Sequence, residues 1–261
     1  MPEPAGKALY DRIGVGYQSV RRPDSRIGSQ IRAAIGDARS VVNVGAGAGS
    51  YEPDDVPTIA VEPSTVMISQ RPAGAAPVIL GVAERLPFRS NSFEVAMASF
   101  TVHHWRDPVV GLSEIQRVSR RQVVLTWDPV YFAEHFWFVR DYLAEDHQAA
   151  GSGTVGPIAE SLGPSVSIEP VLVPADCTDG FYASYWARPE AFLDPAVRAG
   201  ISAFALKDQD AVAGAIDRLS HDLNSGVWDR QYGLLRSAAS MDIGYRLVLA
   251  GSPSGSREPT V

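Results

Sequence analysis

Three glycines at alternate positions follow a short apolar run near the start of the chain. The run 41–44 (Val-Val-Asn-Val) is typical of a buried strand, and Gly45, Gly47 and Gly49 then indicate a tight turn. Glycine adopts positive φ and lets the backbone approach a ligand closely. A second apolar run ends in the acidic Glu62, 17 positions after the first glycine. This layout predicts a nucleoside ligand at the strand ends, with its ribose hydroxyls bound by the Glu62 carboxylate.

The spacing of the glycines distinguishes between two nucleoside cofactors. A dinucleotide fingerprint has the pattern G-x-G-x-x-G, and its third glycine would stand where this chain has Ser50. The pattern here, G-x-G-x-G, resembles the first motif of the class I S-adenosylmethionine (SAM) dependent methyltransferases. The resemblance implies that the turn packs against the methionine part of SAM, with Ala46 and Gly47 nearest to it. The Glu62 carboxylate would also repel the 2′-phosphate of NADP.

A second motif points to the same family. Residues 83–88 (Ala-Glu-Arg-Leu-Pro-Phe) and 92–95 (Ser-Phe-Glu-Val) resemble the A-E-x-L-P-F…S-F-D-x-V run of methyltransferases related to the ubiquinone and menaquinone C-methyltransferases (methyltransferase type 11). In that family the loop after the third strand places backbone and an acidic side chain around adenine. The usual aspartate is replaced here by Val82. The resemblance therefore implies that the Ala83 backbone or Glu84 takes this role.

The resemblance also extends the expected cofactor site to the ends of neighbouring elements. Two further departures from the family pattern are Asn43 and Glu94, where an aspartate is common. These substitutions leave open a catalytically silent SAM-binding protein. The residues that we expect to bind the cofactor beyond the turn and Glu62 are Pro63, Met67, Ala83, Glu84, Ser99 and Phe100.

Two adjacent histidines follow the fourth predicted strand. His103 and His104 belong to the run 99–105 (Ser-Phe-Thr-Val-His-His-Trp), which resembles the family's L-H-H-W run. A histidine titrates near neutral pH and could take a proton from a nucleophile, or it could only bind a neighbouring loop. Asp128, after the fifth predicted strand, is a third catalytic candidate that could orient the acceptor or act as a base. Adjacent histidines point in different directions and no carboxylate stands at i+4, so we expect no metal site.

The N-terminal residues 1–40 are predicted to form a helical lid. The family's lid covers the cofactor with aromatic residues, so the resemblance implies this position for Tyr10 and Tyr17. An aromatic face near the sulfonium would gain from cation–π attraction. Arg21 or Arg22 could pair with the methionine carboxylate, and we assign Arg22 to the cofactor site. The alternative is a packed amphipathic helix with solvated arginines.

These side chains need a scaffold of alternating strands and helices. The predicted strands are 41–45, 58–62, 78–82, 93–99, 122–127, 167–173 and 245–250; the predicted helices include 25–35, 65–69, 107–118, 131–143 and 210–223. Alternation in the first half favours a parallel sheet wound in the right-handed sense. The family implies an α/β, Rossmann-like sheet of seven strands, mostly parallel, with helices on both faces and helical cap insertions. Its last strand is inserted antiparallel.

This scaffold predicts one methyltransferase domain over residues 1–251. Within it, the cofactor-binding core covers 41–128, and cap or substrate elements cover 129–166 and 176–240. Ser, Pro and Gly dominate 252–261, which predicts a disordered tail.

The composition of the chain limits the classes of partner that it could bind. A net charge of −7 argues against nucleic acid, because phosphate binding needs a basic surface. The chain has one cysteine, Cys177, so an intrachain disulfide is impossible. No apolar run approaches the length of a membrane span, and a cytoplasmic location is the default expectation. The partner we expect is a small-molecule methyl acceptor, and the oligomeric state is open.

The predicted reaction is methyl transfer from SAM to an O, N or C nucleophile of that small molecule, with S-adenosyl-L-homocysteine (SAH) as product. Such catalysis depends mainly on positioning and on excluding water, so a dedicated base is optional. The alternative in another enzyme class is an NAD-dependent oxidoreductase of Rossmann type. The glycine spacing argues against it, as does the absence of a Tyr-x-x-x-Lys pair, since Lys7 and Lys207 are the only lysines.

Overall fold

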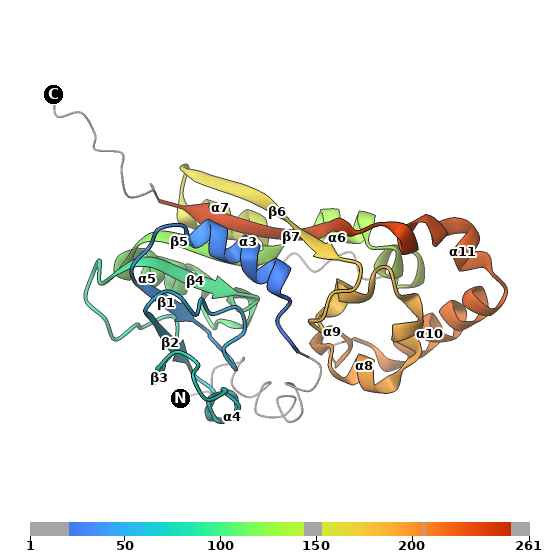
Figure 1. Ribbon diagram of the computed structural model, residues 1–261, viewed down its shortest axis with the longest axis horizontal. Coiled ribbons are helices and arrows are strands. Elements are labelled where there is room, and N and C mark those ends of the chain that lie inside the picture. The colour runs from blue at the N-terminus through green and yellow to red at the C-terminus, as the bar shows by residue number, and fades with distance from the viewer. Residues whose placement is uncertain (1–20, 144–152, 206, 252–261) are drawn as a thin grey trace.

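A computed structural model of the protein describes residues 21–143, 153–205 and 207–251 (Figure 1). Tyr10 and Tyr17, the first half of the predicted lid (1–20) and the predicted tail 252–261 lie outside these residues. Seven strands form one sheet in the order β3-β2-β1-β4-β5-β7-β6. Their bounds are β1 (Val41–Val44), β2 (Thr58–Glu62), β3 (Val78–Leu80), β4 (Phe93–Ser99), β5 (Ser119–Trp127), β6 (Val166–Pro174) and β7 (Ser240–Ala250).

The pairing of the strands confirms the predicted Rossmann-like architecture. β1 to β5 pair in parallel, whereas β7 runs antiparallel to both β5 and β6. β1 is central and buried along its whole length, which explains its apolar run. The strand order reverses at β1, because β2 lies on one side of it and β4 on the other. Ligands of open α/β sheets bind at the carboxyl ends of the strands beside such a reversal.

Helices cover both faces of the sheet. On one face, α3 (Ser25–Ile35) packs Ile27, Ile31 and Ile35 at a spacing of four against alternate strand residues. On the other face, α5 (Pro108–Val118) and α7 (Val155–Leu162) cover the remaining set. α5 begins where predicted, because Asp107 caps its N-terminus and Pro108 takes the first helical position. The short α4 (Thr65–Ser69) follows β2.

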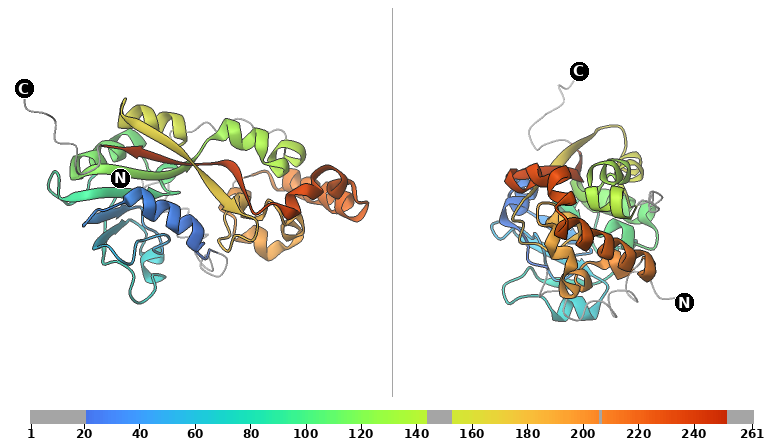
Figure 2. Two further views of the ribbon diagram at one scale, coloured as in Figure 1. Left: turned by 45° about the horizontal axis from the view of Figure 1, so that its top comes forward. Right: turned by 90° about the vertical axis from the view of Figure 1, so that its right-hand side faces the viewer.

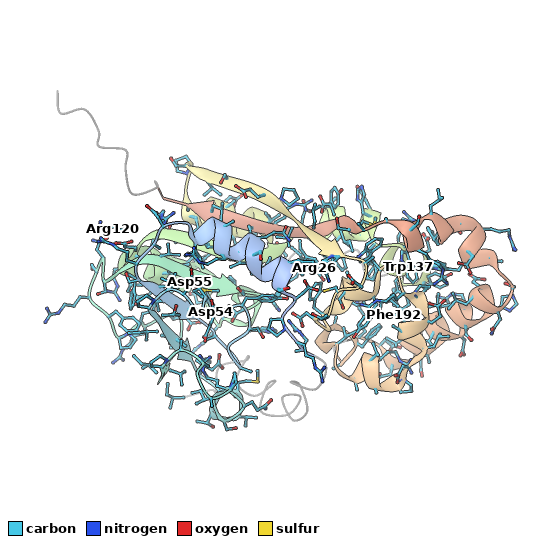
Figure 3. All side chains as sticks on the ribbon, in the orientation of Figure 1. Arg26, Asp54, Asp55, Arg120, Trp137 and Phe192 are labelled. Atoms are coloured by element: carbon cyan, nitrogen blue, oxygen red, sulfur yellow. The ribbon has the colours of Figure 1, made fainter. Side chains whose placement is uncertain are left out.

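A helical cap lies beyond the carboxyl ends of the parallel strands (Figures 1 and 2). Most of it is inserted between β6 and β7, and the rest follows β5. Trp137 and Phe192 lie inside the cap (Figure 3) and are almost fully buried. The cap elements are α6 (Pro129–His135), η2 (Phe138–Tyr142), η3 (Tyr182–Tyr185), η4 (Pro189–Leu193), α8 (Pro195–Ala199), α9 (Ser202–Ala205), α10 (Gln209–Asn224), α11 (Val227–Tyr232) and η5 (Gly233–Ser237).

Several predicted bounds differ from the structure for identifiable reasons. The predicted single helix 131–143 is two elements, α6 and the π-helical η2, because its aromatic side chains pack into the cap core. β7 begins at Ser240 rather than at Tyr245, since its polar first residues pair with β6. α7 was not predicted, because only Ile158 and Leu162 are buried on it. No helix in the described ranges is long and apolar enough to span a membrane.

Candidate functional site

A pocket lies at the carboxyl ends of β1, β2 and β4. It is built from the glycine turn after β1, the end of β2, the loop after β3 and the segment after β4. The residues that line it are Arg21, Asn43, Gly45, Ala46, Gly47, Ala48, Ser50, Glu62, Pro63, Met67, Val82, Ala83, Glu84, Ser99, Phe100, Thr101, His104, Trp105 and Arg106. The structure thus brings together most of the residues that the sequence assigned to the cofactor, from four separate parts of the chain.

The glycine turn approaches its neighbours too closely for side chains. Gly45 has φ of +69° and Gly47 has φ of +54°, a region that residues with a Cβ rarely adopt. A Cβ added at Gly45 would lie 2.0 Å from the Thr101 Oγ1. The Gly45 N–H donates to the Val61 carbonyl at 2.9 Å, which fastens the turn to β2. Gly45 therefore lets the segment after β4 pack directly on the turn.

A buried ion pair contacts the glycine turn and supports it. Arg71 and Glu52 meet at 2.7 Å with side chains only 5% and 7% exposed. Arg71 also donates to the Gly47 carbonyl at 3.2 Å. A Cβ on Gly49, which does not line the pocket, would lie 3.2 Å from the Glu52 Oε2. Because Gly49 has no side chain, the Arg71–Glu52 ion pair can lie close to the turn. Gly45 and Gly47, by contrast, line the pocket.

Asn43 lines the pocket and carries a side-chain amide. Its Nδ2 donates to the Glu52 Oε1 at 3.1 Å, so the amide oxygen points the other way. This Oδ1 is buried and has no hydrogen-bond partner among the described residues. Because buried polar atoms are normally paired, a pocket with this lining suits a ligand that carries a hydrogen-bond donor. The departure from the family's aspartate thus leaves an uncharged acceptor here.

Glu62 is held in the pocket by the backbone on both sides of it. Its carboxylate accepts the Gly47 N–H at 2.8 Å and the Ser64 N–H at 2.9 Å. The residue is only 5% exposed. Ser64 in turn caps α4 by accepting the Met67 N–H at 3.2 Å, which places Pro63 and Met67 in the lining. The carboxylate is therefore oriented by fixed donors before any ligand arrives.

The loop after β3 is positioned by α5. Glu84 accepts the Asp107 N–H at 3.0 Å, next to the start of this helix. The Leu86 N–H donates to Glu114 at 2.8 Å, and Leu86 itself is buried. These contacts explain much of the motif at 83–88 as a packing unit that presents Val82, Ala83 and Glu84 to the pocket. Glu94, by contrast, pairs with Arg39 at 2.8 Å at the opposite end of the sheet.

The segment after β4 carries the two histidines in η1 (Val102–His104). His104 lines the pocket and His103 does not, although their rings are only 3.8 Å apart. His103 packs its ring on Trp127 at 4.8 Å. The surrounding protein lowers the pKa of His104 to about 4, because burial disfavours the charged imidazolium. The pKa of His103 is lowered by the surrounding protein and by His104, although part of its side chain faces solvent.

Besides Gly49 and His103, two further predicted site residues lie outside the pocket lining. Asp128 is outside the pocket lining, and its carboxylate caps α6 by accepting the Val130 and Tyr131 N–H groups, each at 3.1 Å. An aspartate before a proline is a common helix start, and this explains its position. Arg22 is exposed and outside the lining, whereas its neighbour Arg21 lines the pocket. Within the described ranges no group of three or more His, Cys, Asp or Glu side chains could hold a metal ion.

Arg21 connects the pocket to the cap. Its guanidinium pairs with Asp179 at 2.5 Å, and the Asp179 side chain is fully buried. The hydroxyl of Tyr51, which follows the glycine turn, donates to the same carboxylate at 2.6 Å. One aspartate from the segment between β6 and η3 thus binds both Arg21, four residues before α3, and Tyr51, which follows the glycine turn. Nearby, Arg26 of α3, labelled in Figure 3, pairs with Asp176 at 2.6 Å.

Eight lining residues were not among those assigned from the sequence: Arg21, Asn43, Ala48, Ser50, Val82, Thr101, Trp105 and Arg106. Thr101, Trp105 and Arg106 enter the pocket from the segment after β4. Two of them stand inside the run that drew attention to the histidines, so position in that run was the available signal. Trp105 packs on α5, where a Cβ on Gly111 would lie 2.4 Å from its ring. The spacing of apolar residues along the sequence could not predict this contact, because the contact joins a loop to a helix.

Comparisons with known proteins agree with this geometry. Residues 42–126 match a family model described as a methyltransferase domain. The crystal structure of a candidate methyltransferase from an antibiotic biosynthesis pathway of Anabaena variabilis is 32% identical, with a TM-score of 0.75 over 89% of this chain and 99% of that one. The [4+2]-cyclase SpnF is 16% identical, with a TM-score of 0.56 over 98% of this chain and 99% of that one.

A shorter match concerns a curated protein. The uncharacterized protein YafE of Escherichia coli (strain K12) is 40% identical over 40 residues, which are 15% of this chain. The match spans 19% of that relative's own length. It is therefore a local resemblance.

Proposed function

Because the chain belongs to the class I SAM-dependent methyltransferases, we propose that it transfers the methyl group of SAM to an O, N or C nucleophile of a small molecule. SAM supplies a sulfonium methyl that is already activated for displacement. The net charge of −7 favours a small molecule over nucleic acid, and we propose a cytoplasmic location.

The observation that carries the proposal is the pairing of Glu62 with the glycine turn in one pocket. The carboxylate is oriented by the Gly47 and Ser64 N–H groups, and its charge suits the two vicinal hydroxyls of a ribose. The backbone of Gly45 to Gly47, which lines the pocket, suits the methionine part. The unpaired Asn43 Oδ1 suits a ligand donor, and the Ala83 backbone and Glu84 are the groups we assign to adenine.

The remaining lining residues suit positioning more than acid–base chemistry. His104 is the one catalytic candidate in the lining, and with its pKa lowered to about 4 it is neutral at physiological pH. A neutral imidazole can accept a proton from a nucleophile. The Asp128 carboxylate caps α6 and lies outside the pocket lining, so it is poorly placed to act as a base. Displacement at an activated methyl depends mainly on orientation and on excluding water.

Calorimetric titration of the full chain tests the cofactor assignment. We expect SAH to bind in the micromolar range and NADH not to bind. Glu62→Ala should weaken SAH binding about a hundredfold, since two charge-assisted hydrogen bonds are lost. Glu169→Ala removes an exposed acid on β6 and should bind SAH as the wild type does. Binding of NADH without SAH would overturn the proposal.

A second assay must test the reaction itself, because a fold does not determine chemistry. SpnF shares this fold and bears the name of a cyclase. Incubation with methyl-labelled SAM and a panel of acceptors should release SAH and label a product. Binding of SAM without SAH release across O, N and C nucleophiles would favour the catalytically silent alternative.

A further inference from the structure

The segment that leads from β6 into the cap is fastened to the chain just before and at the start of α3. We define the clasp as residues 176–179 on one side and residues 21–26 on the other. Besides the two ion pairs described above, the Thr178 N–H donates to the Asp24 carboxylate at 3.0 Å. In Figure 1, β6 reaches the cap beside the start of α3. The clasp therefore joins residues that are 150 to 158 positions apart in the sequence.

Within the clasp, the Asp179 carboxylate holds the Arg21 guanidinium in one orientation. The Arg21 Nε donates to the Asp179 Oδ1 at 2.5 Å, and the Arg21 Nη2 donates to the Oδ2 at 3.3 Å. The Asp179 side chain is fully buried, and the Arg21 side chain is 11% exposed. A contact through two nitrogens fixes the plane of a guanidinium as well as its position. Arg21 also lines the cofactor pocket, so the clasp determines how a positive charge is presented there.

Tyr51 connects the same carboxylate to the glycine turn. It stands two positions after Gly49 and has φ of +62°, which is costly for a residue with a large side chain. Its hydroxyl donates to Asp179 at 2.6 Å. Burial and the Asp179 charge raise the pKa of this hydroxyl, so it stays protonated and able to donate. Arg21, Asp179 and the end of the turn therefore form one hydrogen-bonded unit.

Arg21 is placed at the end of the pocket that we assign to the methionine part of the cofactor. The lining contains two arginines, Arg21 and Arg106. Arg106 precedes Asp107, whose N–H donates to Glu84, so it belongs to the end that we assign to adenine. His104 is uncharged at physiological pH, because its pKa is lowered to about 4. A guanidinium beside the glycine turn suits the carboxylate of the methionine part, since this pairing is charge-assisted.

We propose that Asp179 is a positioning residue for the cofactor, which orients the Arg21 guanidinium towards the carboxylate of the methionine part. This inference rests on the proposed methyltransferase function and adds a residue of the segment entering the cap to the cofactor site. A long side chain without a fixed partner loses rotamer freedom when a ligand binds it. The buried carboxylate removes much of that loss, because it holds Arg21 in one rotamer before the cofactor arrives.

Calorimetric titration of the full chain with two matched ligands tests this inference. SAH carries the carboxylate, whereas decarboxylated SAH has the same nucleoside, thioether and amine without it. The wild type should bind SAH at least about tenfold more tightly than decarboxylated SAH, the effect of a charge-assisted hydrogen bond. Asp179→Asn should weaken SAH binding about tenfold and change the binding of decarboxylated SAH by less than about twofold. A merely structural role would weaken the binding of both ligands.

Further variants keep the test decisive. Asp176→Asn removes the exposed acid of the same clasp and should bind both ligands as the wild type does. In an Arg21→Gln background, Asp179→Asn should change SAH affinity no further, because its effect acts through Arg21. Tyr51→Phe keeps the Asp179 charge and removes one group that holds the carboxylate. It should weaken SAH binding alone, and it serves if Asp179→Asn does not fold.

The possible failures are distinguishable. Asp179 also offsets the charge of Arg21, so without an orienting role Asp179→Asn would bind SAH equally or more tightly. That result, or equal losses for both ligands in Asp179→Asn and Tyr51→Phe, would overturn the inference. A wild type that binds SAH and decarboxylated SAH equally would overturn the inference and leave the proposed function standing. Absence of SAH binding to the wild type would overturn both.

Discussion

Gly47 donates its backbone N–H to the carboxylate of Glu62 across 2.8 Å. The glycine turn after β1 and the acid at the end of β2 are thus one hydrogen-bonded unit, although 15 residues separate them. A change in the turn therefore shifts the carboxylate that we assign to the ribose. The unit also rests on Arg71, which bonds the Gly47 carbonyl. Substitutions at residues that do not contact the cofactor should therefore also change the affinity for it.

The first prediction concerns the close approach at Gly45. Gly45→Ala places a Cβ against Thr101 at a φ of +69°, whereas Gly74→Ala meets nothing within 4 Å at a φ of +97°. Gly74→Ala should cost about 1 kcal/mol of unfolding free energy through backbone strain alone, and leave SAH binding intact. Gly45→Ala should cost more and abolish SAH binding. Urea unfolding and calorimetry measure both; equal losses in the two variants would contradict the steric account.

The buried pair of Glu52 and Arg71 provides the second prediction. Glu52→Gln or Arg71→Met leaves the other charge buried without its partner, so each should cost about 3 kcal/mol of unfolding free energy. The double variant should cost clearly less than the sum of the two. Each single variant should also weaken SAH binding, because this pair supports the Gly47 backbone. Strict additivity in a urea-unfolding cycle would show that the pair does not act as a unit.

The third prediction is a pH dependence from His104. Its pKa in the folded protein is lowered from 6.5 to about 4, so between these values the unfolded chain binds more protons. Stability should therefore fall as the pH falls from about 6.5 towards 4, and His104→Gln should lose less over that window. NMR titration of the imidazole and urea unfolding at several pH values measure this. A titration midpoint near 6.5 would contradict the lowered pKa of His104.

Asp179 and Asp176 provide a matched pair for the fourth prediction. Asp179→Asn removes the buried partner of Arg21 and weakens the acceptor of Tyr51, so it should cost about 3 kcal/mol and lower SAH affinity. Asp176 pairs with Arg26 but its side chain is 79% exposed. Asp176→Asn should therefore change stability by less than about 1 kcal/mol. Similar losses in the two variants would show that burial does not decide the strength of this contact.

Local sequence patterns were enough to predict the alternating strands of the first half and much of the pocket. The apolar run at β1, the glycine spacing and the acid at Glu62 each report a short-range requirement of the backbone. The same holds for Asp107 and Pro108, which start α5 where expected. Such signals work because strand burial, positive φ and helix capping depend on residues close in sequence.

Tertiary packing alone decided the rest. The contact of Thr101 with Gly45 and the Arg21–Asp179–Tyr51 contact join segments far apart in the chain. Asp128 and Arg22 carry charges that would suit a binding site. In the folded chain, however, Asp128 caps a helix and Arg22 is exposed. Periodicity and spacing describe one element at a time. Which side chains share a pocket depends on how the elements pack together, and that is a property of the folded chain.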